Sequence, residues 1–300
     1  MSLLALLVIP GVGRGTVRRM LQSAPFAVPD WADLRDALAY AMGRRQGMRG
    51  PVLRADFEEA LHRAESIIAA SERNGIHILE PADPRFPVGL QSIPASPVLL
   101  HVLGDPACLN APSRVTLAGT RRPTPYGVEV AESLGRECAR AGFTVASGLA
   151  VGCDTLAHSG CVAAGGRGIA VLAHGLQDVY PPQNRGLADA IVSGGGCLVS
   201  EYHYGEKASP RTFVERDRLQ SGLGQGLIVV ETGIDGGTMH TVRYAIAQGR
   251  PVAAVVHPPD TDSEPSAAGN RLLLDSGWVR PLESGRSAEF LNSLCGGLLG

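Results

Sequence analysis

The sequence has 300 residues, of which 44% are hydrophobic and 19% are charged, with a formal net charge of −2 at pH 7. These values exclude a disordered chain and allow one large globular domain beside a smaller one. The near-neutral balance also excludes a general basic coat for a polyanion, so any nucleic-acid contact has to be a local patch.

The first block, residues 1–75, has a helical pattern of apolar residues and is predicted to be a small accessory domain. Its apolar start, residues 2–10, is too short to span a bilayer and follows no basic residues, so we expect neither an export signal nor an anchor. A glycine-rich hairpin at residues 11–15 then precedes Arg18 and Arg19. This arrangement resembles half of a helix-hairpin-helix or SAM-like unit. Its amides could clasp a DNA phosphate, or the hairpin could be only a tight connection between helices.

The second block is predicted to be a domain over residues 76–290, followed by a tail at 291–300. Two short strands flank a proline-rich connector within residues 76–104. From about residue 114 to residue 281, short and continuously apolar strands alternate with helices. Such strands are typical of a parallel sheet that is buried on both faces, which predicts a doubly wound α/β fold. In these sheets ligands bind beyond the carboxyl ends of the strands.

Residues 115–154 contain two copies of one arrangement: an apolar strand, a turn with glycine and a small hydroxyl residue, and a helix. The turn residues are Gly119, Thr120, Arg121 and Arg122 in the first copy and Ser147, Gly148 and Leu149 in the second. We expect unpaired backbone amides at each turn, near a helix start where the dipole adds positive partial charge. Two such anion sites predict a ligand that carries phosphate groups.

Two later stretches add candidate contacts. The first contains Lys207, Arg211, Phe213, Arg216 and Arg218, and the second, at a helix start, contains Gly236, Gly237 and Thr238. An aromatic ring beside guanidinium groups can grip a single strand through stacking and phosphate pairing. Acidic neighbours could instead make the first stretch a salt-bridged surface helix. The glycines permit close approach of a phosphate or sugar, or the threonine only caps the helix.

Local motifs give little support for catalysis. The sequence has no dinucleotide fingerprint after its first strand, no P-loop and no nucleophile elbow. Glu201 and Glu231 each end a strand, where they could bind a ribose hydroxyl, act as a base or pair with arginine. Asp154 and His158 are spaced i, i+4 but have no third ligand, so we predict no metal site. We also predict no catalytic residue and no cofactor. The six cysteines form no C-x-x-C pair and indicate buried thiols in a reducing cytoplasm.

Six segments follow one another in an order that resembles a known family. They are AGTRRPTPYG, SGLAVGCDTLAHSG, VYPPQNRGLADAI, SEY, FVERDRLQSGL and VVETGIDGGTMHT. Together they resemble the DNA-processing protein A (DprA, also called Smf) family over about residues 76–274, and the helical front end is similar to the family's accessory N-terminal domain. The resemblance implies an extended Rossmann-like fold and a cytoplasmic homodimer that binds single-stranded DNA and no membrane. It further implies a binding protein, not an enzyme, that protects incoming DNA and loads RecA recombinase in natural transformation and recombination.

The resemblance also assigns roles to residues of this sequence. Residues 119–121 match the family's Gly-Ser/Thr-Arg phosphate turn, and residues 147–149 match its second turn. Phe213, Arg216 and Arg218 match the basic helix, and Gly237 and Thr238 match the last helix start. Amides and guanidinium groups along one sheet edge would follow a strand without reading its bases.

The sequence departs from the family pattern at three positions. Val151 stands where a basic residue is usual, Asp217 stands where an asparagine lies between two arginines, and Glu215 adds a further negative charge. All three are expected to weaken a groove for a polyanion. A C-terminal winged-helix domain, which many members have, is not expected, because only about twenty residues follow Trp278.

Two other classes of function stay open from the sequence. One is a nucleotide-binding or nucleotide-sensing Rossmann module. The other is a phosphoribohydrolase like the "lonely guy" enzymes, whose P-G-G-x-G-T-x-x-E motif resembles residues 236–241. That motif needs a glutamate where Thr241 stands, so we do not expect hydrolysis through an oxocarbenium-like centre.

Overall fold

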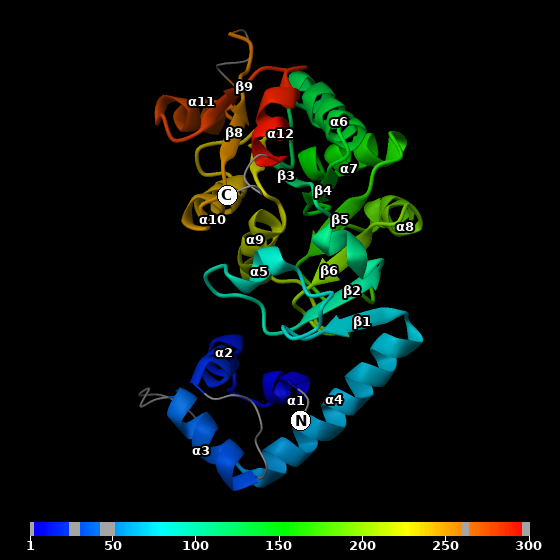
Figure 1. The fold of residues 1–300 in the computed structure, drawn as a ribbon, viewed down its shortest axis with the longest axis vertical. Coiled ribbons are helices and arrows are strands. Elements are labelled where there is room, and N and C mark those ends of the chain that lie inside the picture. The colour runs from blue at the N-terminus through cyan, green and yellow to red at the C-terminus, as the bar shows by residue number, and fades with distance from the viewer. Residues whose placement is uncertain (1–2, 24–30, 43–51, 260–263, 296–300) are drawn as a thin grey trace.

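A computed structural model of the chain describes residues 3–23, 31–42, 52–259 and 264–295. The strands in this part are Ile76–Leu79 (β1), Leu100–Gly104 (β2), Arg114–Ala118 (β3), Thr144–Ser147 (β4), Gly168–Leu172 (β5), Cys197–Ser200 (β6), Leu227–Val229 (β7), Val252–Val255 (β8) and Arg280–Leu282 (β9). They form one sheet in the order β1-β2-β6-β5-β4-β3-β7-β8-β9 (Figure 1). Neighbours from β6 to β9 are parallel, and β1 and β2 extend that edge with antiparallel pairing. The predicted doubly wound, Rossmann-like parallel sheet is therefore confirmed.

Helices cover both faces of this sheet. One face carries Pro125–Arg140 (α6), Cys153–Ala163 (α7), Arg185–Ser193 (α8) and Ser287–Cys295 (α12), and the other carries Val88–Gln91 (α5), Pro210–Leu223 (α9), Thr238–Ala247 (α10) and Ala268–Asp275 (α11) (Figure 1). Short 3-10 turns lie at Pro106–Asn110 (η1) and Pro182–Asn184 (η2). Coverage on both sides explains why the strands are continuously apolar.

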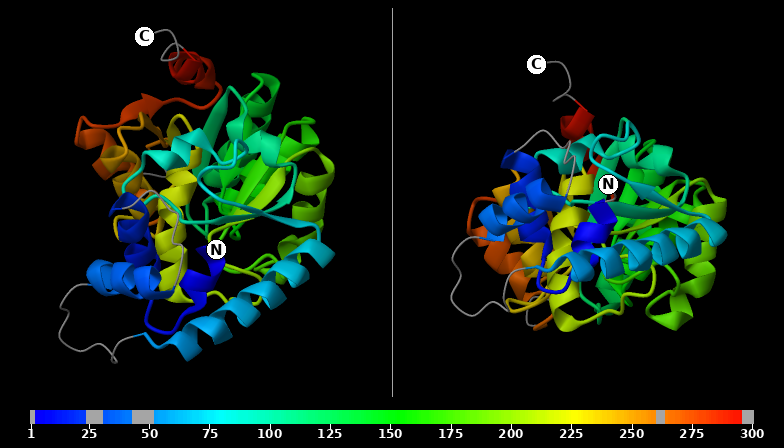
Figure 2. Two further views of the ribbon diagram at one scale, coloured as in Figure 1. Left: turned by 60° about the horizontal axis from the view of Figure 1, so that its bottom comes forward. Right: turned by 90° about the horizontal axis from the view of Figure 1, so that it is seen from below.

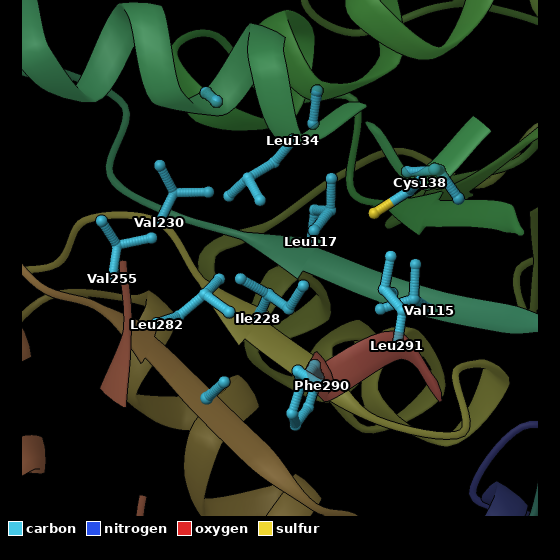
Figure 3. Packing of buried hydrophobic residues seen from close by; sticks show 14 of the residues in the cluster. Val115, Leu117, Leu134, Cys138, Ile228, Val230, Val255, Leu282, Phe290 and Leu291 are labelled. Carbon is cyan, nitrogen blue, oxygen red and sulfur yellow. The ribbon is translucent and has the colours of Figure 1, made fainter. Parts of the chain in front are cut away.

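The core alternates along each strand as the pleat requires. Val115 and Leu117 of β3 pack with Leu134 of α6 and Phe290 of α12 (Figure 3), whereas Ala118 faces the cluster under α10 and α11. The first residues of the predicted C-terminal tail, 291–300, lie in α12. Leu291 is buried in the same core, because α12 covers the β3 face of the sheet.

The strand order places a switch point beside β3. From β3 the chain adds β4, β5 and β6 on one side and then returns to place β7 on the other side. The carboxyl ends of β3 and β7 therefore mark the point where the winding reverses, and the connections that follow these strands diverge to opposite faces. Open α/β sheets bind their ligands at such a crevice.

Four helices precede the sheet: Leu3–Val8 (α1), Arg14–Ser23 (α2), Trp31–Met42 (α3) and Arg54–Arg73 (α4). They build a core of their own and lie at the β1 end of the sheet (Figures 1 and 2). Arg14 lies over the Tyr202 ring at 4.2 Å, and Arg18 donates to the Ser96 carbonyl at 2.8 Å. Arg14 and Arg18 thus contact the sheet domain, and the role of the hairpin amides stays a prediction. The boundary at residues 75/76 stays a prediction.

Two simpler expectations concern the chain as a whole. Among the described helices, none combines the length and apolar character that a bilayer crossing requires. Five of the six cysteines are buried, as expected, but Cys295 at the end of α12 is exposed. All six are free thiols.

Candidate nucleic-acid interface

A cavity of about 730 Å³ lies at the switch point of the sheet. Four segments that are distant in the sequence contribute to its wall: the turn after β3, the start of α7, the α9 helix and the start of α10. The predicted site residues on this wall are Gly119, Thr120, Arg121, Phe213, Arg216, Gly236, Gly237 and Thr238. Separate sequence motifs thus meet in one concave site, as the rule for parallel sheets leads one to expect.

The turn after β3 is clamped between two neighbouring elements. The Thr120 amide donates to the Glu231 carbonyl at 2.7 Å, and the Thr120 carbonyl accepts from the Cys153 amide at 3.1 Å. A Cβ on Gly119 would lie 2.6 Å from the Cys153 Cβ, so only glycine allows this approach. The Thr120 amide is thus engaged inside the protein, unlike the free amide that the sequence predicted. What this turn presents to the cavity is the Arg121 side chain.

Glu231 fixes the start of α6 and is not free for a ligand. Its carboxylate accepts from the Thr124 amide at 3.0 Å and from the Thr124 hydroxyl at 2.7 Å. Thr124 in turn caps α6 by accepting from the Gly127 amide at 3.1 Å. Glu231 is fully buried, so the structure gives it a capping role in place of the ribose contact or catalytic base considered from the sequence.

The second turn does bind an anion, but the anion is a carboxylate of the chain itself. Asp154 accepts from the Ala150 amide at 3.4 Å and lies beside the Gly148 amide and the Ser147 hydroxyl, which itself donates to the Leu117 carbonyl at 2.8 Å. Burial raises the pKa of Asp154, although the nearby Arg216 guanidinium opposes that shift. The second predicted phosphate turn is therefore occupied from within the protein, and Ser147 and Gly148 lie beneath the cavity wall.

The lack of a side chain at Gly148 allows α9 to approach this turn closely. A Cβ at position 148 would collide with the Arg216 guanidinium. Leu149, the last predicted residue of the turn, is fully buried at φ 56° and its carbonyl accepts from Asn184 Nδ2 at 2.8 Å. The predicted residues of the second turn therefore lie behind the cavity wall and do not line the cavity.

The start of α10 is the most open of the predicted anion sites. Its N-cap residue, Gly237, makes no side-chain cap, and a Cβ there would meet nothing within 4 Å. The Gly236 amide donates a hydrogen bond to the Gly233 carbonyl at 3.0 Å, and the Met239 and His240 amides donate to the Gly236 and Gly237 carbonyls, each at 3.0 Å. An uncapped helix start with its positive dipole end on a cavity is suited to a phosphate or carboxylate.

The α9 helix supplies an aromatic ring and one guanidinium. Ser209 and Thr212 form a capping box at its start, with Pro210 in the first turn. The Phe213 ring lies 5.3 Å from the Arg121 guanidinium carbon, in a cation–π arrangement. Arg216 is only 5% exposed and donates to Gln220 Oε1 at 2.8 Å. The cavity thus has one exposed cation, Arg121, and one buried cation, Arg216.

Asp217 is the departure from the family pattern that reaches the cavity. Its carboxylate lies 3.4 Å from the Arg216 Nε atom and is 9% exposed as a residue. Burial, aided by the negative charge of Asp154, raises its pKa to about 6 against the opposing effect of Arg216 and Arg121. The other two departures lie off the wall: Val151 is half-buried, and Glu215 pairs with Arg211 at 2.6 Å.

The remaining predicted cations do not line the cavity. Arg218 is buried, and its Nη2 atom donates to both oxygens of Glu201 at 2.7 and 2.6 Å. Arg211 is held by Glu215, and Lys207 and Arg122 also lie outside the cavity wall. Arg211 and Arg122 are nevertheless exposed. Arg218 is already fully engaged.

The wall also contains residues that the sequence analysis did not predict as binding residues. Among them are Tyr180, Gln220, Thr232, His240, Thr241 and Asp154. Tyr180 lies in the segment VYPPQNRGLADAI, so the family resemblance marked its neighbourhood but not its position at the cavity. Asp154 and His158 are both buried, and no cluster of His, Cys, Asp or Glu in the described ranges could hold a metal ion.

Comparison with known proteins now decides the family. The model of the DNA recombination-mediator protein A family matches residues 77–285. The chain belongs to this family. It is 34% identical to DNA processing protein DprA of Bacillus subtilis over 78% of this chain and 77% of that protein. It is also 29% identical to Protein Smf of Synechocystis over 94% of this chain and 74% of that protein.

Two solved DprA structures extend the likeness to the fold. The structure from Streptococcus pneumoniae matches with a TM-score of 0.78 and 25% identity, covering 97% of this chain and 98% of that one. The structure from Helicobacter pylori, described for its single-stranded DNA binding mode, matches with a TM-score of 0.65 and 26% identity. It covers 74% of this chain and 96% of that one. The DprA resemblance found in the sequence is confirmed.

Proposed function

We propose that the protein binds single-stranded DNA through the cavity at the switch point. The observation that carries this proposal is the convergence of Arg121, the Phe213 ring and the open start of α10 on one wall. A guanidinium and helix amides suit the phosphates, and an aromatic ring suits unpaired bases. The match to a DprA structure described for its single-stranded DNA binding mode supports the same ligand.

Replacing Arg121 with alanine is expected to weaken binding of a labelled oligothymidine about tenfold, because one charge-assisted phosphate contact is lost. The loss should be equal for strands of any sequence, and the slope of log affinity against log salt should become shallower by about 0.7. Fluorescence anisotropy at several salt concentrations measures both quantities. Arg54→Ala, an exposed arginine of α4 that pairs with Glu58 at 2.9 Å, is the matched control. Salt-insensitive binding by the unchanged protein would contradict the proposal.

Binding of a mononucleotide is the second candidate function. It is favoured by the cavity volume of about 730 Å³, which lies in the range of small-ligand sites, and by its position at the switch point. Competition separates the two candidates. If free nucleotides displace oligothymidine only at concentrations far above the oligonucleotide's own affinity, strand binding is the principal activity. Tight nucleotide binding with no strand binding would select the second candidate.

The wider role that we propose follows from the DprA family. It is protection of incoming DNA and loading of RecA recombinase, by a cytoplasmic, dimeric binding protein that is not an enzyme. Apart from the family, the structure offers one feature that supports dimerisation. Leu272 on α11 and Trp278 just after it are large apolar side chains that are 48% and 79% exposed. Contiguous exposed apolar patches often mark a protein interface, and we propose that these two side chains belong to one.

Changing Trp278 to serine is therefore expected to shift the protein from dimer toward monomer at micromolar concentration. The reason is the loss of a large aromatic contact, the type of residue that most often dominates interfaces. Light scattering after size-exclusion chromatography measures the mass. Tyr40→Ser is the control, because Tyr40 on α3 is equally exposed. A monomeric unchanged protein, or a Trp278 variant that stays dimeric, argues against this surface.

A further inference from the structure

We propose that Tyr180, together with Phe213, forms a subsite for one unpaired nucleobase at the rim of the cavity. The inference rests on the proposed strand binding. It adds a contact to a base where the proposed function relies mainly on phosphate contacts, and it gives a role to Tyr180, to which the sequence analysis gave none. Tyr180 lies between β5 and η2, lines the cavity and is 55% exposed. A half-exposed aromatic ring on a cavity wall is available for stacking.

The two rings and one guanidinium form a row along the rim. The Tyr180 and Phe213 ring centroids lie 5.9 Å apart with planes tilted by 53°, and Arg121 lies on Phe213 at 5.3 Å. Because the rings are tilted, they make a wedge and not a closed stack. A strand whose phosphate is held at Arg121 would place the adjoining base at this wedge.

The loop that carries Tyr180 is held firmly from behind. Val179, the preceding residue, is buried in the core beneath α8. Asn184, four residues after Tyr180, donates to the Leu149 carbonyl and to the Thr155 hydroxyl, each at 2.8 Å. A side chain placed on a fixed loop loses little freedom when a ligand binds, so its contact contributes more to affinity.

A role in packing alone explains the position of Tyr180 less well than base stacking does. If Tyr180 only covered Phe213, the ring would be expected to bury itself against the wall, yet more than half of it is exposed. The other strongly exposed aromatic residues of the described chain, Tyr40 and Trp278, are not part of the cavity wall. Stacking is also tolerant of sequence, because every base has a π-face, so the subsite agrees with a strand held mainly through its backbone.

The test compares two strands of equal length and charge, oligothymidine and an abasic oligomer, by anisotropy at one salt concentration. Tyr180→Ala is expected to weaken oligothymidine binding about tenfold, the low end of the usual effect of a stacked base, and to leave abasic binding unchanged. Tyr180→Phe should retain the affinity, and Tyr40→Ala is the control. Thermal melts check that each variant is folded.

The outcomes separate this inference from the proposed function. Equal losses for both strands, or no loss for either, would overturn the base subsite while strand binding stands. If the unchanged protein binds neither strand, both proposals fail. A 2-aminopurine placed within the oligothymidine adds a second readout, because its fluorescence should be quenched on the unchanged protein and less so on Tyr180→Ala. Unequal quenching is not expected from a purely structural tyrosine.

Discussion

Replacing Glu201 with alanine is expected to lower the free energy of unfolding by about 3–5 kcal/mol, the usual cost of leaving one member of a buried ion pair alone. Glu201 is 3% exposed, and its two oxygens accept from Arg218 Nη2 at 2.7 and 2.6 Å. Arg14 approaches the same carboxylate at 3.7 Å. The pair ties α9 to the end of β6 and, through Arg14, to the N-terminal helices. Without Glu201, the buried Arg218 guanidinium would lose its counter-charge.

Urea denaturation of the unchanged and Glu201→Ala proteins measures this loss. Glu283→Ala is the control, because Glu283 forms a comparable pair with Arg286 that is exposed, and such pairs contribute little. A double variant, Glu201→Leu with Arg218→Met, should recover much of the stability, since replacing both members of a buried pair is often neutral. A loss below about 1 kcal/mol for Glu201→Ala would mean that the Glu201–Arg218 pair does not hold α9 to the end of β6.

The fold could be predicted because its signals are local and repeated. Continuous apolar strands such as residues 168–172 require cover on both faces, and a parallel sheet with helices on each side supplies it. The rule that ligands bind beyond the carboxyl ends of strands also predicts that Arg121 and Gly237 lie at one edge of the sheet. The strand order, which sets the switch point between β3 and β7, could not be read from these patterns.

The site was harder to predict because it depends on which polar groups already have partners. The helical spacing already sets Arg218 apart from Arg216 and Phe213, because residues two apart on a helix do not share a face, but it does not show which acidic partner Arg218 has. Arg216 therefore faces the cavity, and Arg218 faces Glu201. The second turn has the expected anion-binding form, but Asp154 fills it. Only the three-dimensional packing reveals such internal partners.

Changing Asp217 to asparagine is expected to strengthen oligothymidine binding at pH 7.5 by up to about thirtyfold. The pKa of Asp217 is raised to about 6, and a phosphate beside Arg121 and Arg216 favours the neutral form of this carboxyl. A pH of 7.5 is about 1.5 units above that pKa, and each unit lowers the population of the neutral carboxyl about tenfold. The asparagine side chain carries no charge, so the variant can bind phosphate without first taking up a proton at any pH.

The same argument fixes the sign of the pH dependence. Affinity of the unchanged protein should rise as the pH falls from 8 to about 6 and level off below, where Asp217 already carries its proton. The phosphodiester charge and the thymine base do not change over that range, and Asp217→Asn should give a nearly flat profile. Asp154, Arg121, Arg216 and His240 also line the cavity. If the asparagine variant keeps the full slope, Asp217 is not the group that takes up the proton. If its affinity at pH 7.5 is also unchanged, the strand does not approach Asp217, and its path must lie along the outer rim of Phe213 and Arg121.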